Sequence, residues 1–558
     1  MLTYIPPHLQ KPTRPDERPW VLLFLVFVWL WPGIINHDPW RPNEPLLYAA
    51  LQSVARGESL LAPTVFDELF VRHAPVFLWL GSIFKNLFSP QWMDGYTAAR
   101  LVTTLFMALA LACAGGAGRE LLGKYHGRSV VLILIGCPGI MIFGHMMGST
   151  PILFAAMCAF IYGIALARRK VMAGGLLMGL GWLFAFASGN FPPLIFLLLM
   201  AVLLPFSPAW RTRRYLLAGI IALALTLPLL PLWPYALWQS HPAAFQVWWQ
   251  QYAFGEFGGA GSLQWDFSLA YVLKNLIWYA LPAWLLAAWS IYKRDILRKP
   301  AGFLCTLWLA LAMLMITLQG NADNDRLLWL LPPLALLGAA GLDTLRRGAT
   351  AFLNWFGIMT FGMMALGIWI MFFAVNYGFP HALATLSARF NPHFTPHWNY
   401  FPMLLALAFT PLWLWAITRK NIRGRQAVTN WAAGMTLVWT LMLSLFLPWL
   451  DSLKSYRPLV MRMQTVLPEE LKSAFADGSE CIDSTRINAL TAWNEYGSIR
   501  VYPPYAAKPQ THCNYRITTI ESAHETIPRG WQILWSGSRG GSSKELFVLM
   551  KNTNEKNE

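Results

Sequence analysis

The chain has 558 residues, of which 56% are hydrophobic and only 13% are charged. These proportions exclude an ordinary soluble globular domain and indicate a polytopic α-helical membrane protein. The net charge of +16 does not indicate nucleic-acid binding, because the Lys and Arg residues fall in short loops between apolar runs rather than in a basic soluble domain.

Apolar runs separated by short polar breaks recur along residues 1–449, which we predict to form a transmembrane domain. Because a helix needs about 20 apolar residues to cross roughly 30 Å of hydrocarbon, we predict about thirteen spans. They are residues 20–36, 97–118, 129–147, 152–167, 172–189, 191–206, 215–235, 271–292, 302–318, 327–342, 352–375, 399–417 and 428–449.

The connections between these spans alternate in charge. Every second one is basic, as in RELLGKYHGR from Arg119, KRDILRK from Lys293 and RKNIRGR from Arg419. The positive-inside rule places the basic loops, and the amino terminus with them, in the cytoplasm. The opposite loops, such as 238–268 and 319–325, carry no Lys or Arg, so we place them on the outer face, which in a bacterial inner membrane is periplasmic.

The first outer loop, residues 36–96, is long and carries two apolar helical patterns. Glu44 to Arg56 has apolar residues at helical spacing, which is typical of a helix lying in the membrane interface. The run from Pro75 to Phe88 is about five residues shorter than a comfortable span, so we also place it on the membrane surface. A tilted transmembrane helix is the alternative, but it would put the basic loops outside, and the charge pattern disfavours it.

Residues 450–558 are polar, with short alternating runs between turn residues, and predict a small α/β domain. We expect a helix from Tyr456 to Phe475 and strands in CIDST, SIRVYP, NYRITTI and ELFVLMK. An odd number of spans places this domain in the periplasm. Of the six cysteines, only Cys481 and Cys513 lie in this polar region, so a disulfide there would join these two.

The sequence NHDPWRPNE directly follows the first apolar run and places Asp38, Arg41 and Glu44 at the edge of the membrane. Charged side chains at a membrane boundary are often functional. The spacing would bring all three to one side of a helix, but the two intervening prolines favour a turn. An ordinary solvated loop is the alternative for this segment taken alone.

Other polar side chains gather on the predicted outer face. They are Arg72 and His73 in VRHAPVFLW, His145 and Thr150 at the ends of HMMGST, and the stretch NADNDRLLWLLPP from Asn321. A carboxylate can act as a general base toward a hydroxyl, and a nearby arginine can hold a phosphate through two hydrogen bonds. This combination suits group transfer from a lipid phosphate. The structural alternatives are an interfacial histidine for His73 and a solvated turn for Asp323 with Asp325.

Three of these segments, in order, resemble motifs of GT-C type membrane glycosyltransferases, the aminoarabinose and protein-mannosyl transferase superfamily (family 39). Asp38, Arg41 and Glu44 match D-x-x-R-x-x-E in the first outer loop. HAPVFLW from His73 is similar to K/H-P-P-L-x-x-W, and RLLWLLPPLALL from Arg326 is similar to R-x-x-Y-L-L-P-x-x-P-A-L-A-L-L. The predicted spans and outer tail also resemble those of aminoarabinose transferases.

The resemblance implies a polyprenyl-phosphate-linked sugar as donor, with Asp38 as the base or a metal-associated carboxylate and Arg326 near the donor phosphate. The sugar would be 4-amino-4-deoxy-L-arabinose or a related one, transferred with inversion to lipid A or another envelope acceptor. The other candidate site residues are Arg41 and Glu44 beside the base, Trp329, Arg72 and His73 at the donor phosphate, and Thr150 and His145 on the acceptor side.

The chain departs from the aminoarabinose transferases at three of these positions. Thr150 stands where they have an aspartate before proline, Arg72-His73 replaces Glu-Lys, and Trp329 replaces a tyrosine. These differences leave the sugar and the acceptor open. They also leave a thin ligand set for a divalent metal, with one carboxylate and either His73 or His145.

Two other functions stay open from the sequence. A transporter or flippase of lipid-linked sugars would also carry cations on the outer face, but it predicts charged or broken helices at the middle of the membrane, and the spans carry few charges. An inactive homologue that only binds glycan is the other alternative, because Thr150 replaces an aspartate.

Overall fold

The computed structural model describes most of the chain. The described residues are 20–66, 68–319, 324–396, 400–418, 424–484, 487–497, 499, 501–503, 513–520, 530–539 and 545–553. The amino terminus expected in the cytoplasm, Asp323 of the predicted solvated turn, and residues 419–423 of the basic loop from Arg419 lie outside these ranges.

Nine helical segments of the described chain are long and apolar enough to cross a membrane, and each coincides with one predicted span. The chain is therefore a multi-pass membrane protein, as predicted. The segments are α4 (Gly95–Leu122), α7 (Thr150–Ala167), α8 (Val171–Gly189), α10 (Arg213–Leu229) with α11 (Leu232–Ser240), α15 (Pro300–Thr317), η4 (Asn324–Leu330) with α16 (Leu331–Gly341) and η5 (Leu342–Thr344), α17 (Arg347–Tyr377), α19 (Tyr400–Ile417) and α20 (Gly424–Leu445).

The other predicted spans are helical but shorter or broken. At 1.5 Å per residue, the helices that replace three of them are too short to cross the hydrocarbon alone. In the fourth, two helices meet at 103°, with Pro282 in the break, where it cannot donate a helical hydrogen bond. These helices are α1 (Trp20–Leu30), α5 (His126–Ile135) followed by α6 (Pro138–Phe143), α9 (Phe191–Leu203) followed by η2 (Leu204–Phe206), and the bent pair α13 (Leu269–Tyr279) and α14 (Ala283–Tyr292).

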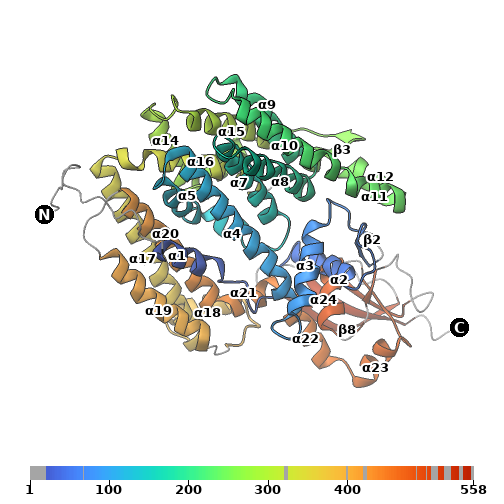
Figure 1. The fold of residues 1–558 in the computed structure, drawn as a ribbon. Helices are drawn as coiled ribbons and strands as arrows, with labels where there is room; N and C mark the ends of the chain where they lie inside the picture. Colours follow the sequence, from blue (N-terminus) through green and yellow to red (C-terminus); the bar gives the residue numbers. More distant parts are fainter. Residues whose placement is uncertain are drawn as a thin grey trace.

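Helices α4, α7, α8 and α10 pack side by side through small residues (Figure 1). A Cβ added to Gly163 of α7 would lie 2.7 Å from the backbone nitrogen of Met178 in α8. One added to Gly175 of α8 would lie 2.7 Å from the carbonyl oxygen of Ala218 in α10. Close backbone approach of this kind is how helices gain packing energy inside a lipid bilayer, where the hydrophobic effect does not drive their association.

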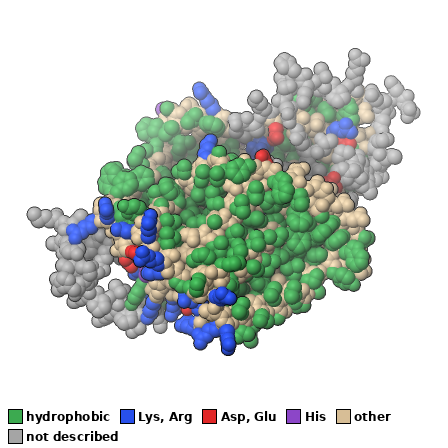
Figure 2. All heavy atoms as spheres, turned by 90° about the horizontal axis from the view of Figure 1, so that it is seen from above, with side chains coloured by type: hydrophobic (Ala, Val, Ile, Leu, Met, Phe, Trp, Pro, Cys, Tyr) green, Lys and Arg blue, Asp and Glu red, His purple; other side chains and the backbone are tan. Residues whose placement is uncertain are grey.

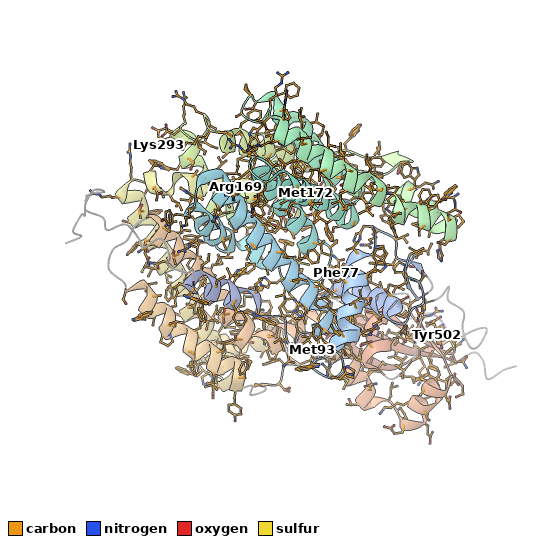
Figure 3. The ribbon with its side chains drawn as sticks, viewed as in Figure 1. Phe77, Met93, Arg169, Met172, Lys293 and Tyr502 are labelled. Carbon is orange, nitrogen blue, oxygen red and sulfur yellow. A yellow bond between two sulfur atoms is a disulfide. The ribbon has the colours of Figure 1, made fainter. Side chains whose placement is uncertain are left out.

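The two ends of the helix bundle differ in charge. In Figure 3, Arg169 and Lys293 of the basic loops lie toward the upper left, whereas Met93 and Tyr502 lie toward the lower right. Figure 2 shows Lys and Arg side chains gathered beside a broad apolar surface. The first outer loop and the carboxy-terminal domain therefore lie at the end opposite these basic loops, as the alternating charge of the connections predicts.

Short elements cover the end of the bundle that carries the first outer loop. Both apolar patterns of this loop form helices, and the second has 13 residues, too few to cross the membrane alone. Their place in the membrane interface stays a prediction. The elements are α2 (Glu44–Ala55), β1 (Thr64–Val65), β2 (Glu68–Leu69), α3 (Val76–Phe88), α12 (Pro242–Gln251), η3 (Gly255–Phe257), β3 (Gly258–Gly259), β4 (Ser262–Leu263) and α18 (His381–Phe390).

The carboxy-terminal region contains a five-stranded sheet with strand order β6-β5-β7-β9-β8. The pairs β5/β6 and β5/β7 are parallel, and β7/β9 and β9/β8 are antiparallel. This confirms the predicted small α/β domain, although the predicted helix is two helices separated by Pro468. The elements are α21 (Leu447–Lys454), α22 (Arg457–Val466), α23 (Glu469–Asp477), β5 (Ile482–Ser484), α24 (Ile487–Tyr496), β6 (Val501–Tyr502), β7 (Tyr515–Ile520), β8 (Trp531–Ser538) and β9 (Leu546–Asn552).

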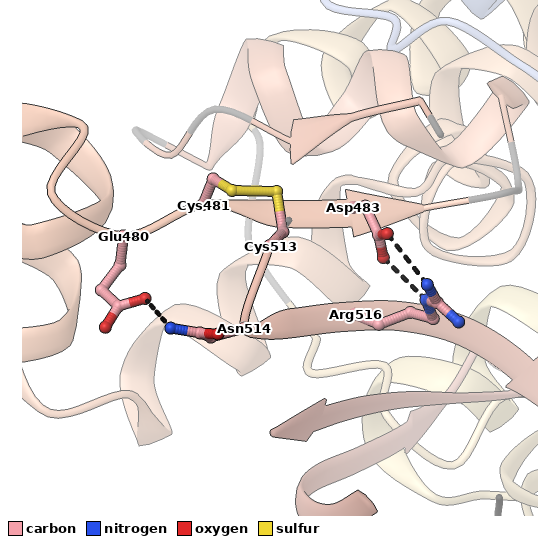
Figure 4. The surroundings of a disulfide bond; sticks show 6 residues. All are labelled: Glu480, Cys481, Asp483, Cys513, Asn514 and Arg516. Carbon is pink, nitrogen blue, oxygen red and sulfur yellow. Dashed lines mark hydrogen bonds and ion pairs between the residues drawn. A yellow bond between two sulfur atoms is a disulfide. The ribbon is translucent and has the colours of Figure 1, made fainter. Parts of the chain in front are cut away.

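Cys481, just before β5, and Cys513, two residues before β7, form a disulfide bond (Figure 4). On the same two strands, Arg516 donates two hydrogen bonds to Asp483, at 2.8 and 3.1 Å. The hydrophobic core of the domain begins at Tyr456. The domain boundary after residue 449 stays a prediction, because α21 runs across it.

Candidate active site

A cavity of about 840 Å³ lies at the end of the bundle that carries the first outer loop. Its wall is built from α2, the segment before α3, residues 143–154, the junction of α8 and α9, the β3–β4 hairpin and η4. Volumes of this order hold small-molecule ligands. Five residues proposed from the sequence line it: Arg72, His73, Thr150, Arg326 and Trp329.

Arg72 presents an exposed guanidinium to this cavity. Within the described part of the chain, no carboxylate forms an ion pair with it. Its guanidinium carbon lies 5.7 Å from the centre of the Phe70 ring, and its carbonyl oxygen accepts a hydrogen bond of 2.8 Å from Asn190. An arginine without a carboxylate partner at the membrane edge is suited to bind an anionic ligand.

Asn190 fixes the Arg72 segment and was missed by the sequence analysis. Its amide nitrogen also donates to the carbonyl oxygen of Tyr252 at 2.8 Å, and its Oδ1 accepts from the indole of Trp248 at 3.1 Å. The residue is buried and has a φ of +60° with a ψ of −144°, a backbone conformation that residues other than glycine rarely adopt. Its position in the break between two apolar runs, SGNFPP, is the sequence signal that could have found it.

His73 lies beside Arg72 with its Nδ1 3.1 Å from the carbonyl oxygen of Ala74. Burial, with a smaller contribution from the positive charge of Arg72, lowers the pKa of His73. The imidazole is therefore neutral at neutral pH, and the positive charge at this point of the cavity comes from Arg72.

Arg326 is already held by neighbouring side chains, in contrast to Arg72. Its Nη2 donates to Glu256, its Nη1 donates to Oε1 of Gln319 at 3.1 Å, and its Nε lies 3.9 Å from Oδ1 of Asp325. Glu256 reaches the cavity from η3 and was not singled out in the sequence. The guanidinium thus sits between two carboxylates that also line the cavity.

Trp329 is almost fully buried, although it lines the cavity. Its ring centre lies 5.3 Å from that of Phe196, and its carbonyl oxygen accepts a 2.8 Å hydrogen bond from the indole of Trp308. Aromatic packing of this kind fixes the segment that carries Arg326.

Thr150 begins α7, and its hydroxyl donates to Oδ2 of Asp325 at 3.0 Å. The chain thus has a carboxylate beside Thr150, although it comes from η4 and not from position 150. The sequence analysis considered Asp325 as part of a solvated turn, whereas the structure places it in the cavity wall.

Asp38 is not among the residues that line the cavity. Its Oδ1 accepts a hydrogen bond of 3.3 Å from Arg457 in α22 of the carboxy-terminal domain. A second carboxyl group, that of Asp451 in α21, lies nearby and accepts a 2.6 Å hydrogen bond from the indole of Trp40. Burial, together with the negative charge of Asp38, raises the pKa of Asp451 to about 8.

Glu44 is buried and accepts three hydrogen bonds. They come from the backbone nitrogen of Trp40 at 2.8 Å, the hydroxyl of Tyr96 at 2.8 Å and the backbone nitrogen of Met147 at 3.0 Å. Met147 lines the cavity. Glu44 therefore does not line the cavity but holds Met147, which does.

Arg41 and His145 also lie outside the cavity lining. Arg41 is exposed, and among the described residues it forms no ion pair with Asp38 or Glu44. The ring nitrogens of His145 lie 2.8 and 2.9 Å from the carbonyl oxygens of Met141 and Trp29. The D-x-x-R-x-x-E side chains therefore diverge from a turn followed by α2, as the prolines predicted, instead of converging on one another.

Within the described ranges, no three His, Cys, Asp or Glu side chains are grouped as metal ligands usually are. The two cavity carboxylates are instead joined through the guanidinium of Arg326. The structure thus adds no residues to the thin ligand set expected from the sequence.

No protein-family model and no curated protein matches the sequence. Among solved structures, ArnT from Cupriavidus metallidurans in the apo state superposes with a TM-score of 0.66 and 14% identity, covering 95% of this chain and 97% of ArnT. The chain has the ArnT fold. ArnT bound to undecaprenyl phosphate gives a TM-score of 0.63 and 14% identity, with 95% and 96% covered.

The likeness to ArnT extends over nearly the whole of both chains. It therefore includes both the helix bundle and the carboxy-terminal sheet. This confirms the fold that the three ordered motifs predicted.

Proposed function

We propose that the protein is a bacterial inner-membrane glycosyltransferase that transfers a sugar from a polyprenyl phosphate to an acceptor at the periplasmic face. The observation that carries this proposal is the cavity at the outer end of an ArnT fold, whose wall holds two carboxylates and an arginine with no carboxylate partner among the described residues. One of the similar ArnT structures is bound to undecaprenyl phosphate, which is the class of donor lipid that the motifs imply.

Arg72 is the first candidate to hold the donor phosphate. Its guanidinium has no described carboxylate partner, and it can offer two parallel N–H groups to phosphate oxygens. His73 is neutral and its Nδ1 proton points at the carbonyl oxygen of Ala74, so it lines the cavity beside Arg72 without offering the phosphate an N–H. Arg326 contributes positive charge across the cavity, but each of its two terminal nitrogens already donates one hydrogen bond, to Glu256 and to Gln319.

The reaction requires one displacement. The acceptor oxygen attacks the anomeric carbon, the bond from that carbon to the phosphate oxygen breaks, and the polyprenyl phosphate leaves with the bonding electrons. The arginines stabilise the charge that develops on the leaving phosphate. A single displacement inverts the configuration of the sugar, whose identity we propose as 4-amino-4-deoxy-L-arabinose or a related sugar, with lipid A or another envelope component as acceptor.

The test of the donor site is a binding titration of purified protein with undecaprenyl phosphate. Losing one bidentate charge-assisted contact should weaken binding by about 10- to 100-fold in Arg72→Ala, and Arg72→Lys should fall between it and the parent. Arg56→Ala is the matched control, because Arg56 is also exposed near the outer face and does not line the cavity. A parent protein that does not bind the lipid would overturn the proposed function.

The orientation in the membrane is tested separately. A reporter fused after Leu450 should be active only if it reaches the periplasm. Activity of that fusion in the cytoplasm alone would contradict the proposed periplasmic site.

A lipid-linked sugar transporter is the second candidate. The observation in its favour is the 103° bend between α13 and α14, because transporters often have broken helices. Mass spectrometry of lipid A and surface glycans separates the two functions. A deletion strain should lose one sugar-bearing species if the protein is a transferase, whereas loss of a transporter should also accumulate the lipid-linked precursor on the cytoplasmic side.

A further inference from the structure

Two carboxylates line the cavity, Asp325 and Glu256, and their surroundings differ. Glu256 accepts a hydrogen bond from Nη2 of Arg326, and this bond holds the arginine in place. Asp325 uses one oxygen for the hydroxyl of Thr150 and turns the other toward Nε of the same arginine at 3.9 Å. Asp325 therefore keeps acceptor capacity that Arg326 does not saturate.

The two oxygens of Asp325 have separate positions. Oδ1 is buried, and no described residue donates a hydrogen bond to it. The side chain as a whole is nevertheless 32% exposed and lines the cavity, and of its two oxygens we assign Oδ2 to the cavity side. A carboxylate oxygen can accept two hydrogen bonds, and within the described residues Oδ2 has one, from Thr150. One acceptor position of Oδ2 is thus available to a ligand in the cavity.

From this geometry, and resting on the proposed function, we propose that Asp325 is the general base that takes the proton of an acceptor hydroxyl. The hydroxyl donates to Oδ2, its proton moves to that oxygen, and the acceptor oxygen forms the new bond to the anomeric carbon as the bond to phosphate breaks. The polyprenyl phosphate departs with the bonding electrons. Thr150 is a positioning residue, because its hydrogen bond fixes the rotation of the carboxylate.

The proposal also specifies the class of acceptor. A hydroxyl must lose a proton to become a good nucleophile, and a carboxylate can accept it. A phosphate acceptor is already anionic, needs no base, and would be repelled by Asp325 and Glu256. We therefore expect the product to carry a glycosidic bond to a hydroxyl oxygen rather than a glycosyl phosphate.

Asp38 is the alternative base, since the family resemblance implies that role. Its carboxylate is outside the cavity lining and is paired with Arg457. The two assignments predict opposite results for the variants Asp325→Asn and Asp38→Asn, because only the variant that lacks the base should lose transfer.

The experiment measures two quantities for each variant. The first is the affinity of purified protein for undecaprenyl phosphate, and the second is restoration, in a deletion strain, of the sugar-bearing species that the strain lacks. Asp325→Asn should bind the lipid within about twofold of the parent while transfer falls by about 10²- to 10⁴-fold. Glu256→Gln is the matched cavity control and should lose less transfer than Asp325→Asn.

Thr150 provides a second set of variants. Thr150→Ser keeps the hydroxyl and should keep transfer. Thr150→Ala should reduce transfer by about 5- to 10-fold, the value of one hydrogen bond, while its affinity for undecaprenyl phosphate stays within about twofold of the parent. Thr150→Asp combined with Asp325→Thr moves the carboxylate to the neighbouring side chain and should recover part of the transfer lost in Asp325→Asn. Recovery of this kind is not expected if Asp325 only stabilises the fold.

The outcomes are distinguishable. If the parent neither binds undecaprenyl phosphate nor restores any sugar-bearing species, the proposed function fails and this assignment fails with it. If the parent does both and Asp325→Asn transfers normally while Asp38→Asn does not, Asp38 is the base and the assignment to Asp325 is overturned. A product in which the sugar is bonded to a phosphate, recognised because mild acid releases the free sugar and leaves the phosphate on the acceptor, would also overturn it.

Discussion

The half-buried carboxyl group of Asp451 should make a pH-dependent contribution to the contact between the helix bundle and the carboxy-terminal domain. Burial and the nearby charge of Asp38 raise its pKa from an ordinary 3.8 to about 8. The folded protein therefore binds this proton more tightly than the unfolded chain does. The stabilisation is fully present below about pH 4 and is lost as the pH rises through about 8. Replacing Asp451 with Asn should remove this dependence, because the amide does not titrate.

The magnitude follows from linkage. Between about pH 6 and pH 9 the unfolded carboxyl is already ionised, so the loss depends only on the folded pKa of about 8 and amounts to about 2 to 3 kcal/mol. At roughly 2 °C per kcal/mol, the apparent Tm of the parent should fall by up to about 5 °C relative to Asp451→Asn over this range.

The assay is thermal unfolding of detergent-solubilised parent and Asp451→Asn at a series of pH values. Asp38→Asn serves as an internal control, because removing the negative charge of Asp38 should lower the pKa of Asp451 and move the loss of stability to lower pH. Parallel curves for the parent and Asp451→Asn from pH 6 to pH 9 would refute the reasoning.

Three further predictions concern other residues. Glu44→Ala should destabilise the fold by about 3 to 5 kcal/mol, because it leaves three donors unpaired, two of them buried, including the hydroxyl of Tyr96. Unfolding curves would contradict this if the loss stayed near zero. Arg326→Ala should weaken undecaprenyl phosphate binding more than Arg326→Lys, because lysine keeps the charge and loses only the bidentate geometry. If the alanine variant binds the lipid as tightly as the parent, Arg326 only organises the cavity wall. Denatured but unreduced protein should label at four cysteines and reduced protein at six, since Cys481 and Cys513 are joined and the other four are free; labelling of all six without reduction would rule the disulfide out.

The candidate site was only partly predictable from the sequence. Arg72, His73, Thr150, Arg326 and Trp329 were singled out and do line one cavity. Polar residues at the ends of apolar runs can be read from the sequence, and helices that cross a membrane bring such residues to one face.

The sequence and the structure differ in the carboxylates that they place at the site. Asp38 belongs to the D-x-x-R-x-x-E motif but lies against Arg457, whereas Asp325 and Glu256 lie in the cavity without belonging to a recognised pattern. The D-x-x-R-x-x-E spacing describes neighbours along the chain. It does not describe which residues of other segments fold against them.

The sequence by itself determined that the chain crosses a membrane many times, because hydrocarbon demands long apolar segments, and the positions of Lys and Arg predict which ends stay in the cytoplasm. Both constraints act locally and leave a local signal. Only the tertiary structure decided which charged groups share the cavity, because the hydrogen bond from Thr150 to Asp325 joins positions 175 residues apart. Such a contact depends on how η4 packs against the start of α7, and the packing of two distant segments leaves no periodic pattern in either of them.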